Sequence, residues 1–85
     1  MANNDVWQFP CVIHLKIVGD QRDGFAEDVI SEIQHAIPGD YSVRETPSSA
    51  GRYVSLTVPV HFDNAEQLQN IYRALRTIAG VKMVL

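Results

Sequence analysis

The stretch CVIHLKIV (residues 11–18) decides the fold, because it places an apolar side chain at every odd position with His14 and Lys16 between them. Such a period of two predicts a β-strand buried on one face only. We expect Gly19 and residues 20–23 to end this strand, since they are rich in turn formers. The sequence therefore opens its fold with one strand whose odd positions face a core.

Two helices follow from apolar residues that recur at helical spacing. We expect Asp23 to cap the first helix, and Asp63 to begin the second in capping-box spacing with Glu66. Residues 38–39 (Pro-Gly) and Gly80 end the two helices. The apolar stripes are Phe25, Val29, Ile33 and Ala36 in the first helix, and Leu68, Ile71, Tyr72, Leu75 and Ile78 in the second.

Three further segments are predicted as strands. Residues 41–46 form a short edge strand before Pro47, residues 52–60 alternate cleanly with Pro59 ending regular pairing, and residues 81–85 close the chain. The order is strand, helix, strand, strand, helix, strand, which is the ferredoxin-like βαββαβ arrangement. We therefore predict an α+β sandwich in which two helices cover one face of a four-stranded antiparallel sheet. The usual strand order in this fold places the first and third strands at the centre.

Length and composition fit one compact domain. The chain has 85 residues, of which 46% are hydrophobic and 20% charged. These values leave no room for a separate catalytic domain and argue against disorder. We expect residues 1–9 to form a flexible or partly packed lead and residues 10–85 a single domain. Trp7 and Phe9 in this lead either pack back on the domain or anchor another chain.

The charge and the cysteine count argue against several classes of protein. A net charge of -3 disfavours nucleic acid as a partner. One cysteine, Cys11, cannot form an intramolecular disulfide or half a zinc site, and we expect neither a metal nor a cofactor. The first ten residues lack a secretory leader pattern, and no stretch approaches the roughly 18 apolar residues of a membrane span. We therefore expect a cytoplasmic protein that does not bind membranes.

The uncovered face of the sheet is the first candidate binding surface. His14 and Lys16 lie two residues apart, so both point to this face and could bind an anion. The alternative is that these polar residues simply solvate the open side of the sheet. The candidate residues of this face are His14, Lys16, Tyr53, Ser55 and Thr57, with Val12 beside them.

Two loops form the second candidate. Backbone donors of the serine-rich loop, with Arg44 and Arg52 nearby, could hold a phosphate or carboxylate. Turn chemistry alone explains the same composition, and the loop lacks the lysine of a P-loop. The candidate loop residues are Asp20, Arg22 and Asp23 after the first strand, and Ser48, Ser49, Gly51 and Arg52 in the later loop.

Several motifs resemble one family. The chain resembles the YbeD-like family of small bacterial proteins at residues 9–10 (Phe-Pro), 38–41 (Pro-Gly-Asp-Tyr), 47–49 (Pro-Ser-Ser) with Gly51, Tyr53 and Ser55, and 83–85 (Met-Val-Leu). The resemblance covers residues 9–85 and implies a ferredoxin-like fold and a bacterial cytosolic source. It implies no catalytic residue. The chain also resembles ACT-type regulatory domains, which bind small effectors near the loop after the first strand, although Asp23 stands where such domains often have proline.

Three functions remain open from the sequence. The first is a non-enzymatic regulatory or adaptor domain that binds a small effector or a protein partner, and a homodimer fits it as well. The second is a small enzyme of the acylphosphatase kind, with Arg22 and either Asn64 or Asn70 in the required roles. The third is an RNA-binding module that stacks bases on Tyr53, although the first strand offers no aromatic residue.

Overall fold

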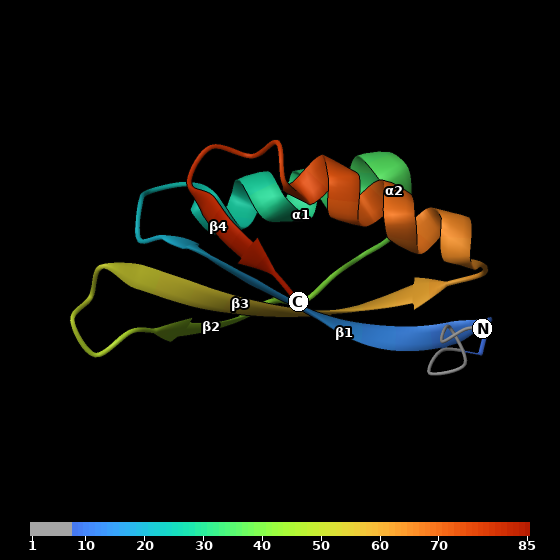
Figure 1. Cartoon of the computed structure of the whole chain (residues 1–85), viewed down its shortest axis with the longest axis horizontal. Helices are drawn as coiled ribbons and strands as arrows, with labels where there is room; N and C mark the ends of the chain where they lie inside the picture. The colour runs from blue at the N-terminus through green and yellow to red at the C-terminus, as the bar shows by residue number, and fades with distance from the viewer. Residues whose placement is uncertain (1–7) are drawn as a thin grey trace.

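The computed structural model describes residues 8–85 and contains a four-stranded antiparallel sheet with two helices on one face (Figure 1). The strand order across the sheet is β2-β3-β1-β4, so β1 and β3 are central. The prediction of a ferredoxin-like βαββαβ sandwich is confirmed. The elements are β1 (Cys11–Asp20), α1 (Phe25–Ala36), β2 (Arg44–Pro47), β3 (Tyr53–Phe62), α2 (Ala65–Leu75) and β4 (Val81–Val84).

The core lies between the sheet and the helices. Leu15 of β1 faces Val58 of β3 in the strand register, and both side chains are fully buried. Each such aliphatic side chain stabilises the fold by about 2 kcal/mol when it leaves water. The remaining buried residues come from the predicted stripes and strand faces, namely Ile13, Ile17, Phe25, Val29, Ile33, Val54, Leu56, Val60, Phe62, Leu68, Ile71 and Leu75.

The first strand runs two residues further than predicted. Gly19 does not begin a turn, because β1 continues to Asp20. The backbone of Gly19 lies very close to Phe25 and Gly80. A Cβ atom at position 19 would lie 2.8 Å from the Gly80 carbonyl oxygen and would also overlap the Phe25 ring. The glycine is therefore needed because two other segments press against this point of the strand.

Pro59 does not end regular pairing, contrary to the prediction. It lies inside β3 and faces His14 of β1, and the strand continues to Phe62. On its other side β2 begins only at Arg44, which faces Thr57. Position 59 therefore lacks a neighbouring strand on that side, and a residue without an amide donor is tolerated there.

Both predicted helix caps are displaced by one residue. Gly24, with φ +80°, takes the N-cap position of α1, and Asp23 makes no side-chain cap. At α2 the cap is Asn64, whose Oδ1 accepts a hydrogen bond from the Gln67 amide at 2.9 Å. The Gln67 side chain in turn accepts from the Asp63 amide at 2.7 Å. Asn64 and Gln67 thus form a capping pair with the spacing predicted for Asp63 and Glu66, shifted by one residue, so that the Gln67 amide is bound in place of the Glu66 amide.

Phe9 and Cys11 are partly buried and pack against the core. Phe9 therefore packs back on the domain and is not left free to anchor another chain, whereas Trp7 lies outside the described residues. At the other end of the chain, Leu85 exchanges two backbone hydrogen bonds with Lys16, of 2.8 Å and 3.2 Å. The last residue thus extends the pairing of β4 with β1.

Candidate binding surfaces

The sheet face opposite the helices carries the predicted polar residues. It is called the open face here, and its centre is a row of three residues on neighbouring strands. Lys16 on β1 faces Thr57 on β3, and Thr57 faces Arg44 on β2. Directly paired residues point to the same side of a sheet, so a lysine and an arginine flank one threonine hydroxyl. We call Lys16, Thr57 and Arg44 the cation row.

Acidic groups are scarce on the open face. Asp20 is the one carboxylate among its described strand residues, and its Oδ1 lies 3.8 Å from Lys82 Nζ. Neither Lys16 nor Arg44 makes an ion pair within residues 8–85. The outward strand residues are Val12, His14, Lys16, Val18, Asp20, Arg44, Thr46, Tyr53, Ser55, Thr57, Pro59, His61 and Met83. A chain with net charge -3 therefore has a basic centre on this face.

A depression of about 300 Å³ opens beside the cation row. Arg44, Thr57 and His14 line it together with Pro59. Residues 42–43, which lead into β2, complete the wall, where Ser42 adds a hydroxyl and the side chain of Val43 turns to the helix side of the sheet. The lining thus combines a guanidinium group, an imidazole and two hydroxyls with no carboxylate.

Tyr53 and Ser55 lie at the far end of the open face, away from this depression. Tyr53 faces Asp20 of β1, and Ser55 faces Val18. A second depression of about 210 Å³ lies here, against Thr46 and the β2–β3 hairpin. The structure therefore divides the predicted face, because His14 and Thr57 line one hollow, Tyr53 and Ser55 line another, and Lys16 lines neither.

The predicted loop residues meet at one end of the sheet. The β1–α1 loop, the β2–β3 hairpin and the α2–β4 loop lie at the same end, at the left in Figure 1. The Gln21 amide donates to the Arg52 carbonyl oxygen at 3.0 Å, and the Asp20 amide donates to that of Gly80 at 3.0 Å. We call this meeting of three loops the loop junction. The end of β1 is thus joined to Arg52, and Arg22 and Asp23 follow in the same loop.

Arg22 is already engaged at the loop junction. Its Nη2 donates to Asp28 Oδ2 at 2.8 Å and to the Ala79 carbonyl oxygen at 3.0 Å. Its Nε donates to the same carbonyl at 3.3 Å, and its Nη1 donates to the carbonyl oxygen of Asp23 at 3.1 Å. All three nitrogens of the guanidinium group therefore serve to hold the β1–α1 loop, α1 and the α2–β4 loop together.

The serine loop forms an ordinary turn. Ser48 Oγ accepts from the Tyr53 amide at 3.2 Å, and the Ser48 carbonyl oxygen accepts from the Gly51 amide at 2.9 Å. Gly51 has φ +72°, a conformation that favours glycine. Ser49 and Arg52 are exposed. These contacts account for the composition of the hairpin without a ligand.

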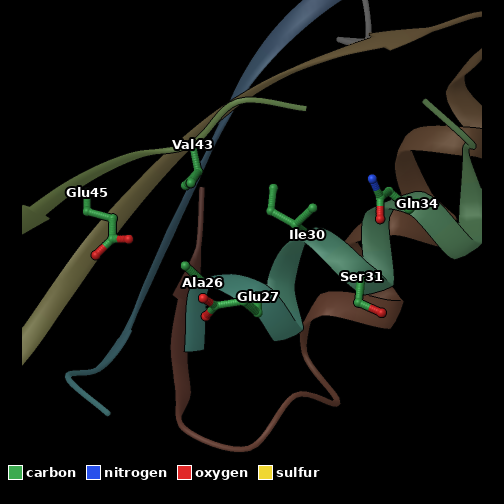
Figure 2. Close-up of a pocket in the computed structure, with 7 residues that line it drawn as sticks. All are labelled: Ala26, Glu27, Ile30, Ser31, Gln34, Val43 and Glu45. Carbon is green, nitrogen blue, oxygen red and sulfur yellow. The ribbon is translucent and has the colours of Figure 1, made fainter. Parts of the chain in front are cut away.

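A groove of about 370 Å³ lies between α1 and β2, on the helix side of the sheet. Figure 2 shows its two walls, with Ala26 and Ile30 on the helix opposite Val43 and Glu45. Glu27 joins Glu45 in the lining, so this side of β2 is acidic whereas Arg44 makes its other side basic. Local sequence patterns do not predict this groove, because its width depends on how far α1 lies from the edge strand β2.

Titration and metal chemistry add little in the described part of the chain. Burial raises the pKa of Tyr41 above its ordinary value of 10.0, and its hydroxyl donates to the Ile37 carbonyl oxygen at 2.6 Å. Among residues 8–85, no three His, Cys, Asp or Glu side chains gather where they could hold a metal ion. No helix in the same range is long and apolar enough to cross a membrane.

Two solved structures share the fold. The solution structure of an H. pylori protein superimposes with a TM-score of 0.72 over all of this chain and 96% of that one, at 13% sequence identity. The crystal structure of the ACT domain from GTP pyrophosphokinase of Chlorobium tepidum gives a TM-score of 0.64 over 87% of this chain and 94% of that one, at 19% identity. At such low identity these likenesses establish the fold alone.

Sequence comparisons establish the family. The DUF493 family, described as a protein of unknown function, matches residues 4–85. A UPF0250 protein of Shewanella loihica is 42% identical over 82 residues, which cover 96% of this chain and 93% of the relative. A UPF0250 protein of Haemophilus influenzae is 36% identical over 81 residues, which cover 95% of this chain and 88% of the relative. The chain therefore belongs to the DUF493 family, and the YbeD-like resemblance of its motifs is confirmed.

Proposed function

We propose that this chain is a non-enzymatic regulatory or adaptor domain of the cytoplasm, which binds a small effector or a protein partner through its open face. The observation that carries the proposal is the cation row. Lys16 and Arg44 are exposed, lie on a face that no helix covers, and make no ion pair within residues 8–85. Charged groups left in this state bind an anionic partner without first breaking internal contacts.

The acylphosphatase alternative finds no support in the arrangement of its residues. Arg22 stands at the loop junction, where β1 ends, whereas Asn64 begins α2 at the opposite end of the sheet. The Asn64 side chain caps α2, and Asn70 Oδ1 accepts from Arg73 at 3.1 Å. A substrate could not contact Arg22 and Asn64 together without rebuilding the fold.

The RNA-binding alternative is disfavoured by the surroundings of its aromatic residue. Tyr53 is 39% exposed, but Asp20 lies directly opposite on β1. A carboxylate at that position repels a phosphate backbone that would run past the ring. The basic centre of the open face is two rows away and holds no aromatic side chain.

A second copy of the chain fits the exposed edge strand β2 poorly. Across a twofold axis, a register centred on Glu45 sets two carboxylates opposite each other, and one centred on Arg44 sets two guanidinium groups opposite each other. A register centred on Thr46 puts Pro47, which lacks an amide donor, opposite Glu45. We therefore propose that the binding partner is a different molecule and not a second copy paired through this edge.

Affinity capture from the native cytoplasm tests the proposal, with mass spectrometry of bound proteins and small molecules. The face variant is Lys16→Glu with Arg44→Glu, and the matched control is Arg52→Glu with Arg73→Glu, which makes the same charge change elsewhere. We expect the wild type and the control to retain the same ligand and the face variant to lose it. If the face variant and the wild type retain the same ligands, the open face is not the binding surface and the proposal fails.

A further inference from the structure

We propose that the depression beside the cation row binds a small molecule through an oxyanion group, that is, a phosphate or a carboxylate. The inference rests on the proposed function and names the chemical class of its ligand. It starts from the set of side chains that three separate segments bring to one hollow, which are His14 on β1, Ser42 and Arg44 at the start of β2, and Thr57 on β3.

The donors in this hollow match an oxyanion. The guanidinium group of Arg44 offers N–H donors in a fork that fits two oxygens of a phosphate or carboxylate, and the hydroxyls of Ser42 and Thr57 can each donate one hydrogen bond. Lys16 adds a second cation from the next strand beyond Thr57. Because neighbouring strands lie about 4.8 Å apart, the two cations are roughly 10 Å apart at the backbone, and long side chains can converge on one anion between them.

The size and the apolar walls restrict the ligand further. A volume of about 300 Å³ is at the lower end of the range for small-molecule sites. Pro59 supplies an apolar side chain to the lining, whereas the side chain of Val43 packs on the helix side of the sheet. The hollow therefore suits an oxyanion that carries a short apolar group, and it is too small for a folded partner to enter.

The guanidinium group of Arg44 is free of internal contacts among the described residues, unlike that of Arg22. Arg22 uses its guanidinium nitrogens to hold the loop junction together. Arg52 lies on the hairpin, beyond the hollow, and its backbone carbonyl is bound to Gln21. Within residues 8–85 Arg44 makes neither a side-chain hydrogen bond nor an ion pair, so an incoming anion competes with water alone.

Titration followed by two-dimensional NMR of backbone amides tests the inference on the whole chain. Sodium phosphate and sodium acetate are the probes, at an ionic strength held constant with sodium chloride. We expect saturable shifts at residues 14, 44 and 57, and an affinity about tenfold weaker in Arg44→Gln, which corresponds to roughly 1.4 kcal/mol. A stronger response to phosphate identifies a phosphate ligand, and a stronger response to acetate identifies a carboxylate ligand.

Two variants serve as controls. Arg52→Gln makes the same change on the hairpin and should leave both titrations as in the wild type. Thr57→Val keeps the shape of the side chain while it removes the hydroxyl, and it should weaken binding while the amide signals of core residues stay in place. Shifts that do not saturate, that centre on the loop junction, or that are equal in Arg44→Gln and the wild type would overturn the inference.

The result also separates this inference from the proposed function. If the face variant loses its captured ligand but neither probe binds in the hollow, the open face is functional and the oxyanion site is wrong. If the probes bind in the hollow but capture is the same in the face variant and the wild type, the oxyanion site stands and the proposed function fails.

Discussion

The loop junction and the cation row use similar residues in opposite ways. Both contain an arginine, although the sequence pattern groups Arg44 with the serine-rich loop and only Lys16 and Thr57 with the open face. At the junction Arg22 binds Asp28 and the carbonyl oxygen of Ala79, so its charge stabilises the fold. In the cation row, Arg44 and Lys16 make no ion pair with the described residues, so their charge remains available.

The difference shows that residue type and exposure alone do not identify a binding site. A guanidinium group whose hydrogen bonds are already made inside the protein gains little from a ligand, because each new bond replaces an existing one. Substitutions at the junction should therefore reduce stability, whereas substitutions in the cation row should reduce binding.

Gly19→Ala should have the largest effect, with a loss of about 3 kcal/mol in the free energy of unfolding. The added methyl group would lie 2.8 Å from the Gly80 carbonyl oxygen and overlap Phe25, so the junction and the core must both shift. Urea denaturation measures the change. Gly39→Ala is the control, because its nearest neighbour is Tyr41 at an ordinary 3.5 Å. A loss below about 1 kcal/mol would mean that the junction is more pliable than its packing indicates.

Arg22→Ala should cost about 2 kcal/mol, since it removes charge-assisted hydrogen bonds to Asp28 and to the Ala79 carbonyl oxygen. Thermal and urea unfolding would show the loss. The same truncation at Arg52, on the exposed hairpin, should leave stability nearly unchanged. Equal stability of the two variants would remove the structural role assigned to Arg22.

Tyr41→Phe should cost about 1 kcal/mol at pH 8, because it removes the hydrogen bond to the Ile37 carbonyl oxygen. Burial raises the pKa of Tyr41 in the folded state, so the unfolded chain loses this proton first as the pH rises above 10.0. The stabilisation is therefore present below that pH and lost above it. Urea unfolding at pH 8 and pH 11 should show the advantage of the wild type shrinking, and a constant difference would contradict this assignment.

Arg44→Gln should change the free energy of unfolding by no more than about 0.5 kcal/mol, the usual range for an exposed residue without internal contacts. Urea denaturation of this variant beside Arg22→Ala compares the two arginines directly. A loss as large as that of Arg22→Ala would show that the cation row also supports the fold, and the division between the two regions would no longer hold.

Local patterns determined most of the fold. The alternation in residues 11–18 and the helical stripes fixed which faces are buried, because side-chain direction in a strand or helix follows from position along the chain. The predictions that were wrong concern single positions, such as the residue that caps each helix. Asp63 and Asn64 are both good caps in adjacent positions, and the sequence offered no contact to choose between them.

The tertiary structure alone decided which candidate residues are available to a ligand. Arg22 binds the carbonyl oxygen of Ala79, 57 positions away, and the cation row joins residues 16, 44 and 57 through the registers of two strand pairs. Local sequence preferences act over a few residues. Register and hydrogen-bond partners, however, depend on how distant segments pack, and these contacts determine whether an arginine holds the fold together or is free to bind.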